Sequence, residues 1–246
     1  MLLIAFVSLG VQAQGLFGSS GVMPIQMFVD SAKSAGHSAL QHPSLLWWWS
    51  SDAGIRTVWM LGAAAALLLT CGVVPKLALA VCWLSYLSFF SVGWPFMSFQ
   101  WDTLLLETSF TAFFLVPWRL WDRPGSHPGP HPVARWALWW LLFRLIFRSA
   151  YVKLGSGDPA WADLSALSYH YFTQPLPNVV AWYANLLPAW CQKASCALMF
   201  AIELGAPFLI WIPRPWARRS AAASIGMLML LIVLTGNYGF FNLLTL

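Results

Sequence analysis

Four ionisable residues stand inside long apolar runs of the sequence: Glu107, Arg144, Arg148 and Glu203. A charge at the depth of a lipid bilayer costs several kcal/mol unless it is paired or hydrated, so such residues mark ion pairs, substrate cavities or proton paths. The set is neutral, and Arg144 and Arg148 share one helix face because they are four residues apart. This composition predicts that the two carboxylates pair with the two guanidinium groups.

The expected depths of these residues agree. At 1.5 Å per helical residue, Glu107, Arg144 and Glu203 lie roughly 9 to 13 Å below the outer ends of their runs. We therefore expect one interhelical cluster in the outer half of the membrane. Gln100, Asp102 and Asn237 would extend it toward the outer surface. Two interpretations are open: a static clamp that fixes helix packing, or a polar cavity for a headgroup, a peptide or a small substrate.

Other site chemistry is not indicated. His127 and His131 are four residues apart but lie in a loop rich in proline and glycine, and two ligands do not make a metal site. His170, between two tyrosines, is expected to lie at the surface or the membrane interface. The sequence contains no glycine-rich phosphate loop, nucleophile elbow or zinc-protease motif, so neither a cofactor nor a metal is expected.

The elements that must position these residues are membrane helices. Hydrophobic residue types make up 59% of the chain and charged types only 9%, against about 25% charged residues in ordinary soluble domains. A soluble globule so poor in charge could not cover its surface with polar groups, and a disordered chain would not be this apolar. The net charge is +5, but the basic residues sit in short connections rather than on one face, so no nucleic-acid partner is expected.

The apolar runs predict an all-α fold, a polytopic bundle of about six to seven transmembrane helices. It is expected to form one membrane-embedded domain over residues 1–246, truncated at its C-terminal end, where residues 240–246 resemble the start of a further helix. A short run at residues 1–15 is either a span that lacks its beginning or a cleaved signal peptide. The six runs of adequate length are 55–74, 77–94, 103–120, 133–152, 195–212 and 220–236.

The charges of the connections alternate along the chain. One set of connections holds seven basic residues and one acid, and the other set holds four basic residues and five acids. The positive-inside rule assigns the first set to the cytoplasm. The long connections, 16–54 and 153–194, are therefore expected to face the lumen, the periplasm or the cell exterior, and to contain short interfacial helices.

Two helix starts are indicated in the second long connection. Asp158 followed by Pro159 is typical of a helix N-terminus, because an acidic cap and a proline at the first position both favour one. Asn178 is expected to cap a second short helix over 179–190, which carries no charge and is too short to span a membrane. We expect this helix to lie in the interface or to fold back among the others.

Several long strings of residues recur in a known family. They are FQWDTLLLET at 99–108; LFRL and VKL at 142–145 and 152–154; DPAW, LSAL and YHYFTQPLP at 158–161, 164–167 and 169–177; and LTGNYGFFNLLT at 234–245. Together they closely resemble the lipase maturation factor family. The similarity covers essentially the whole chain, and strings of this length are highly specific.

The resemblance implies a multi-pass membrane protein, in eukaryotes of the endoplasmic reticulum membrane, that assists the folding and assembly of secreted lipases. It implies a chaperone-like role rather than a known reaction, so an enzyme is not the expected class. The partners would be the lipid bilayer and a secreted lipase or other exported client. Family members continue beyond the point corresponding to Leu246 into a large lumenal part, which the resemblance credits with client binding. The composition also suggests a bacterial source, whose member would lie in the plasma membrane.

A more distant similarity supplies an alternative function. The helical core of the family resembles that of the vitamin K-dependent carboxylase, in which a lysine just after a membrane helix acts as a base. Lys153 falls at a comparable place. Partly desolvated beside Arg144 and Arg148, such a lysine would release its proton more readily, as a general base must. The other interpretation is an ordinary interfacial lysine paired with Asp158 or Asp163.

Overall fold

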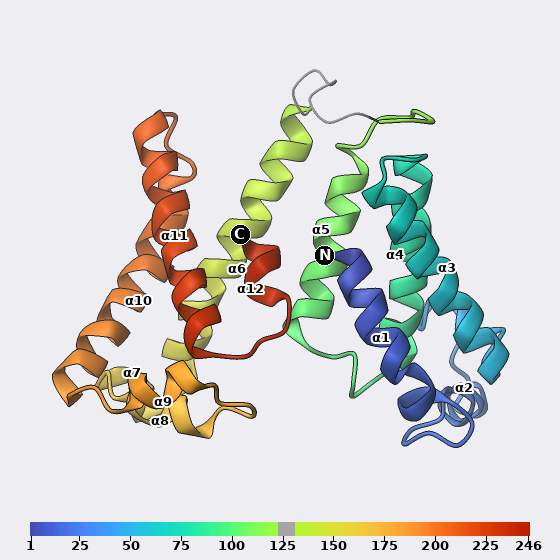
Figure 1. Ribbon diagram of the computed structural model, residues 1–246, viewed down its shortest axis with the longest axis horizontal. Coiled ribbons are helices and arrows are strands. Elements are labelled where there is room, and N and C mark those ends of the chain that lie inside the picture. The colour runs from blue at the N-terminus through green and yellow to red at the C-terminus, as the bar shows by residue number, and fades with distance from the viewer. Residues whose placement is uncertain (123–130) are drawn as a thin grey trace. The chain divides into compact units, whose positions relative to one another are not determined.

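The computed structural model describes residues 1–122 and 131–246. Within these residues, the secondary structure consists of helices and one isolated β-bridge. This confirms the all-α prediction. The chain divides into two compact units, unit 1 (Met1–Arg135) and unit 2 (Trp136–Leu246), whose helices are labelled in Figure 1. Of the two loop histidines, His127 lies outside the described residues, and His131 immediately precedes a helix.

Unit 1 is a set of helices packed side by side. They are α1 (Leu2–Phe17), α2 (Ile25–Ser34), the 3₁₀ turn η1 (Leu45–Trp47), α3 (Asp52–Thr70), α4 (Pro75–Val92) and α5 (Gln100–Phe113). Helix α3 packs against both α1 and α4, and α4 packs in turn against α5 and η1. Fully buried side chains from α1, α3 and α4, among them Phe6, Ile55 and Phe89, form its core.

Helix α1 approaches α3 so closely that glycine is needed at two points of contact. A Cβ atom on Gly10 would lie 1.9 Å from the Trp59 ring, and one on Gly62 would lie 2.1 Å from the Phe6 ring. The Trp59 indole N–H also donates a hydrogen bond of 2.6 Å to the Phe6 carbonyl. The two glycines therefore set the distance between these helices, because any larger side chain would push them apart.

Helix α5 ends at Phe113, so the predicted boundary at residue 120 is wrong. The residues that follow leave the helix and reach the turn between α3 and α4, where the Val74 N–H donates a hydrogen bond of 2.8 Å to the Leu120 carbonyl. Pro117 has no N–H and could not have continued the helical ladder. The turn between α3 and α4 and the segment after α5 thus meet at one end of unit 1.

Unit 2 is built around a hairpin of two long helices, α10 (Ala189–Leu209) and α11 (Pro215–Thr235). The remaining helices are α6 (Pro132–Gly155), most of which belongs to this unit, α7 (Pro159–Ala162), α8 (Ala166–Thr173), α9 (Val179–Asn185) and α12 (Phe241–Thr245). Helix α10 packs against α11 and α8, and α9 and α12 pack against α11. The core of the unit includes Ile146 of α6, Cys196 and Ile202 of α10, and Ile225 of α11.

The long connections contain short helices, as predicted, but two boundaries differ. Helix α9 ends at Asn185 rather than at residue 190, and Trp190 belongs to α10, which begins at Ala189 instead of residue 195. Pro188 occupies the N-cap of α10 and has no N–H with which to continue α9. One predicted helix is therefore divided by its proline.

Both predicted caps are confirmed. The Asp158 carboxylate accepts a hydrogen bond of 2.9 Å from the Ala160 N–H at the start of α7. The Asn178 side-chain oxygen accepts one of 2.8 Å from the Ala181 N–H at the start of α9. Each cap satisfies a backbone donor that has no partner within its own helix.

Three helices among the described residues are long and apolar enough to cross a membrane: α3, α4 and α11. Helices α6 and α10 are as long, with 24 and 21 residues, but their composition is not that of the three candidate spans. Of these five long helices, α3 and α4 belong to unit 1, and α10, α11 and most of α6 belong to unit 2. The charged residues of α6 and α10 are the ones that form the candidate site.

Candidate functional site

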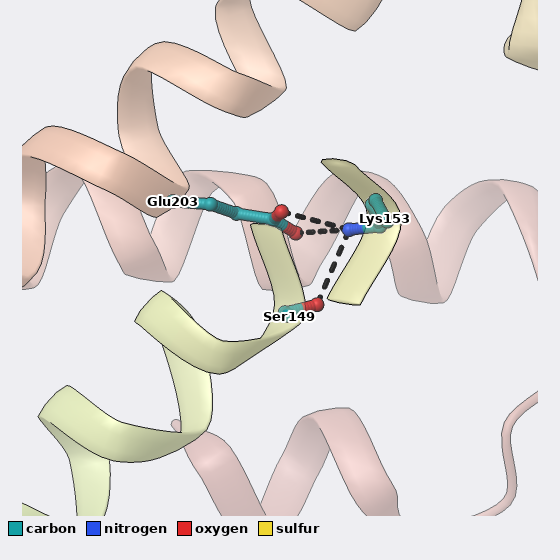
Figure 2. A network of polar contacts seen from close by, with 3 residues as sticks. All are labelled: Ser149, Lys153 and Glu203. Carbon is teal, nitrogen blue, oxygen red and sulfur yellow. Dashed lines mark hydrogen bonds and ion pairs between the residues drawn. The ribbon is translucent and has the colours of Figure 1, made fainter. Parts of the chain in front are cut away.

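An ion pair joins α6 to α10 inside unit 2. The Lys153 ammonium, in the last turn of α6, donates hydrogen bonds of 2.5 and 2.7 Å to the two carboxylate oxygens of Glu203. It also donates one of 3.2 Å to the Ser149 hydroxyl. Figure 2 shows the three side chains converging, two from α6 and Glu203 from α10. Ser149 reaches the ammonium because residues four apart lie on one face of a helix.

The carboxylate of this pair is buried, whereas the ammonium is partly exposed. The Glu203 side chain is 3% exposed and the Lys153 side chain 21%. The Trp161 ring of α7 lies over the ammonium, with its centroid 5.7 Å from the nitrogen. Because little water reaches the carboxylate, loss of either partner would leave an uncompensated charge in an apolar place.

This geometry does not favour Lys153 as a general base. A base must present a free lone pair to its substrate, whereas the Lys153 nitrogen donates hydrogen bonds to both carboxylate oxygens of Glu203 and to the Ser149 hydroxyl. The partner of the lysine is Glu203, so the expected pairing with Asp158 or Asp163 is wrong. Lys153 ties two long helices together.

The α6–α10 connection, residues 156–188, is anchored to the end of α11 by two side-chain amides. Gln174 Nε2 donates a hydrogen bond of 2.9 Å to the Thr235 carbonyl, and Asn178 Nδ2 donates one of 3.1 Å to the Leu234 carbonyl. The last carbonyls of a helix lack partners within the helix, so the amides take positions that water would otherwise occupy. Figure 1 shows α8 and α9 next to this end of α11.

His170 of α8 adds a third tie. Its Nε2 lies 2.9 Å from the Tyr238 hydroxyl, and the two rings stack with 7° between their planes. Burial, and then the charge of Lys153, lower the pKa of His170, which favours a neutral imidazole that can accept a hydrogen bond from the Tyr238 hydroxyl. Burial also raises the pKa of Tyr238, so its hydroxyl remains a donor. The histidine is partly buried between these groups, and its place at the membrane interface stays a prediction.

A cavity of about 510 Å³ opens beside α7 and α8. Hydrogen bonds from the Ser165 hydroxyl and N–H lower the pKa of Asp163, so that this carboxylate is ionised at neutral pH. Trp161, which covers Lys153, also forms part of the wall. The charged and aromatic side chains of the lining are Asp158, Asp163, Trp161, Tyr169 and His170.

The four residues predicted to form an intramembrane cluster belong to both units. Glu107 is half-buried on α5, Arg144 is half-buried and Arg148 exposed on α6, and Glu203 is buried on α10. The partner of Glu203 is Lys153, which the sequence suggested either as a base or as a partner of Asp158 or Asp163. That all four residues form one cluster stays a prediction.

The residues predicted to extend this cluster have these positions. Asp102 is 3% exposed and accepts a hydrogen bond of 2.6 Å from the Tyr86 hydroxyl, which ties α5 to α4 within unit 1. The same carboxylate accepts a hydrogen bond of 3.3 Å from the Phe99 N–H, at the start of α5. Gln100 and Asn237 are exposed.

Three partners of the site were not predicted from the sequence: Ser149, Gln174 and Tyr238. One signal existed for Ser149, which precedes Lys153 by four residues. No local signal existed for the amides of Gln174 and Asn178, because their acceptors are backbone carbonyls 61 and 56 residues away.

The helices and the site define a class: a helical membrane protein with a buried ion pair between two long helices and a connection anchored to the end of a third. Residues 1–246 match the model of the lipase maturation factor transmembrane domain. The chain therefore belongs to the lipase maturation factor family and is an integral membrane protein.

Relatives cover nearly the whole chain. Lipase maturation factor 2 of Xenopus laevis is 42% identical over 260 residues, 99% of this chain and 36% of the relative. Lipase maturation factor 2 of Homo sapiens is 39% identical over 264 residues, 99% of this chain and 37% of the relative. Lipase maturation factor 1 of Bos taurus is 30% identical over 254 residues, 99% of this chain and 45% of the relative. The chain thus spans less than half of the length of these relatives. No solved structure matches it.

Proposed function

We propose that this chain acts as a multi-pass membrane assembly factor that assists the maturation of exported proteins, secreted lipases among them. The observation that carries the proposal is the match to the lipase maturation factor transmembrane domain over residues 1–246. Relatives named lipase maturation factor 2 and lipase maturation factor 1 align with 99% of the chain. The ion pair of α6 and α10 is structural in this proposal, because it joins helices and its lysine is occupied by a carboxylate.

We propose six to seven spans. Helices α3, α4 and α11 meet the length and hydropathy of a span. Helices α6 and α10, of 24 and 21 residues, are about 36 and 32 Å long at 1.5 Å per residue, enough for a hydrocarbon core of about 30 Å. Helices α1 and α5, of 16 and 14 residues, are shorter and would cross a locally thinned bilayer.

The arrangement within each unit supports the orientation derived from charge. In unit 1, Lys76 lies over the Phe113 and Trp118 rings at the end where α5 finishes, at 4.7 and 5.1 Å. In unit 2, the Arg218 guanidinium lies over the Trp139 ring, 4.5 Å from its centroid, near the turn between α10 and α11. In the proposed orientation these ends face the cytoplasm, and the α6–α10 connection faces the lumen or the periplasm.

The proposed location follows from this orientation. In a eukaryotic cell the chain would lie in the endoplasmic reticulum membrane, and in a bacterium in the plasma membrane. The α6–α10 connection would then face the compartment that an exported client enters. Its three ties to the end of α11 would hold it in place for that contact.

Deletion of the gene in its own cell tests the proposal. We expect the activity of a secreted lipase to fall while its transcript is unchanged, and the lipase to co-purify with the tagged protein. Reintroduction of the wild-type gene should restore activity. Unchanged activity of all secreted lipases in the deletion strain would contradict the proposal. A reporter fused within the turn between α10 and α11, residues 210–214, should be cytoplasmic, and one at residues 156–158 should be on the opposite side.

A further inference from the structure

The cavity beside α7 and α8 has an acidic and aromatic lining. Its two carboxylates are Asp158 and Asp163, and its rings are those of Trp161, Tyr169 and His170. None of the described residues that line it is lysine or arginine. An ionised carboxylate attracts a cation through charge and hydrogen bonds, and an aromatic face attracts one through its quadrupole. This combination is suited to an organic cation.

The carboxylates are held in position before any ligand arrives. One oxygen of Asp158 accepts the Ala160 N–H at 2.9 Å, and one oxygen of Asp163 accepts the Ser165 N–H at 2.8 Å. Between Asp163 and Ser165, Leu164 adopts a φ of 63°, which places it in the left-handed region. This conformation costs a leucine roughly 1–2 kcal/mol, and its side chain packs against the core of unit 2. The core contact thus holds the turn that carries Asp163.

The cations nearest to the cavity do not cancel its charge. Lys153 lies behind the Trp161 ring, and its ammonium is neutralised by both oxygens of Glu203. The charge of Lys193 lowers the pKa of Asp163 less than the two hydrogen bonds from Ser165 do, and Lys193 does not line the cavity. The lowered pKa of His170 leaves the imidazole largely neutral at pH 7. The lining therefore keeps a net negative charge.

We propose that this cavity binds the guanidinium or ammonium group of a basic side chain on an exported polypeptide. The inference rests on the proposed function, since that function brings such polypeptides to the α6–α10 connection. A guanidinium offers five N–H donors and a planar face, which match two carboxylates and several rings. A choline headgroup has no N–H donor and would leave the hydrogen-bonding capacity of both carboxylates unused. Asp158 and Asp163 are exposed, which suits a ligand that arrives from water.

The test uses the full chain purified in an uncharged maltoside detergent. The probe is a pentapeptide with two arginines, acetylated and amidated at its ends, and the comparison peptide carries citrulline in place of arginine. We expect the arginine peptide to bind and the citrulline peptide to bind at least tenfold more weakly. The double variant Asp158→Asn/Asp163→Asn should lose about tenfold or more in affinity for the arginine peptide.

Asparagine is chosen because it keeps the cap hydrogen bonds while it removes the charges. The matched control is Asp30→Asn, which neutralises an exposed carboxylate in the other long connection and should leave affinity unchanged. Equal binding of the two peptides, or unchanged affinity in the double variant, would overturn the inference. Binding of phosphocholine that displaces the arginine peptide at equal concentration would overturn it in favour of a lipid headgroup site.

The two proposals fail in distinguishable ways. If deletion of the gene leaves secreted lipases active but the arginine peptide binds through Asp158 and Asp163, the cavity assignment stands and the maturation role falls. If deletion abolishes lipase activity but the double variant binds the peptide as wild type does, the maturation role stands and the cavity assignment is overturned.

Discussion

Lys153 and Glu203 are 50 residues apart in the sequence, yet the lysine ammonium contacts both oxygens of the glutamate, the nearer at 2.5 Å. The pair joins the last turn of α6 to the middle of α10. Each charge makes the other tolerable in an apolar environment, so the two residues act as one structural unit.

We expect Glu203→Gln to destabilise the protein by about 3–5 kcal/mol, the usual cost of removing one partner from a buried ion pair. Lys153→Met should behave similarly, whereas Lys153→Met/Glu203→Leu should recover most of the loss because no charge is left unpaired. Thermal unfolding in detergent and abundance in the membrane measure these effects. Ser149→Ala serves as a control, because it removes one hydrogen bond and should cost about 1 kcal/mol.

The same variants separate the structural role of Lys153 from a catalytic one. A lysine that served only as a base would be replaceable by methionine without loss of stability, and only activity would disappear. Wild-type unfolding temperatures for Lys153→Met would therefore contradict the structural assignment.

Gln174→Leu should loosen the end of α11. The substitution leaves the Thr235 carbonyl without its side-chain donor, which costs about 1–3 kcal/mol if water cannot replace the amide. Hydrogen–deuterium exchange should accelerate over residues 234–240, while the first turns of α11 keep their protection. Gln12→Leu is a matched control, since that glutamine is exposed and its amide bonds only within α1. Equal exchange in both variants would show that the amide does not anchor the connection.

Local patterns predicted the helices and several of their ends. Apolar runs bounded by proline and glycine predicted the long helices. Asp158 and Asn178 were correctly predicted to cap the starts of α7 and α9. These signals work because each cap acts on a backbone N–H two or three residues away. The end of α5 was not predicted because it depends on residues far upstream. Backbone groups of the segment after α5 form hydrogen bonds with the turn between α3 and α4 instead of continuing the helix.

The partners of the charged residues were harder to predict. Composition and helical spacing indicated that Glu203 needs a cation, but α6 carries three candidates: Arg144, Arg148 and Lys153. Glu203 pairs with Lys153 because the end of α6 lies beside Glu203 of α10. The position of one helix along another depends on tertiary packing, which a single sequence does not reveal. The same holds for Asp102, whose partner Tyr86 belongs to another helix.

The stability of unit 2 should depend on pH through His170. Burial lowers the pKa of this histidine below the value of about 6.5 that it has in the unfolded chain. As the pH falls through about 6.5, the unfolded chain binds a proton that the folded protein resists, so stability decreases until the pH reaches the folded pKa. Unfolding temperatures measured between pH 7.5 and 5.5 should therefore fall toward acid.

His170→Gln should flatten that dependence, because glutamine does not titrate. Tyr238→Phe removes the hydrogen bond from the other side and should lower the unfolding temperature at every pH while the acid-side slope remains. If the unfolding temperature of His170→Gln fell toward acid as steeply as that of the wild type, a group other than His170 would have to cause the pH dependence.

Gly62→Ala should destabilise the protein although alanine favours helices. The added Cβ would lie 2.1 Å from the Phe6 ring, and Phe6 is fully buried, so the ring cannot move into solvent. Overpacking of this kind costs about 1–3 kcal/mol, which exceeds the roughly 1 kcal/mol that alanine gains over glycine in a helix. Gly205→Ala in α10 is the matched control, because no heavy atom lies within 4 Å of its Cβ position. Only the propensity gain acts there, so the unfolding temperature should rise. The two alanine variants should change the unfolding temperature in opposite directions. A rise of the unfolding temperature in both variants would show that glycine does not set the distance between α1 and α3.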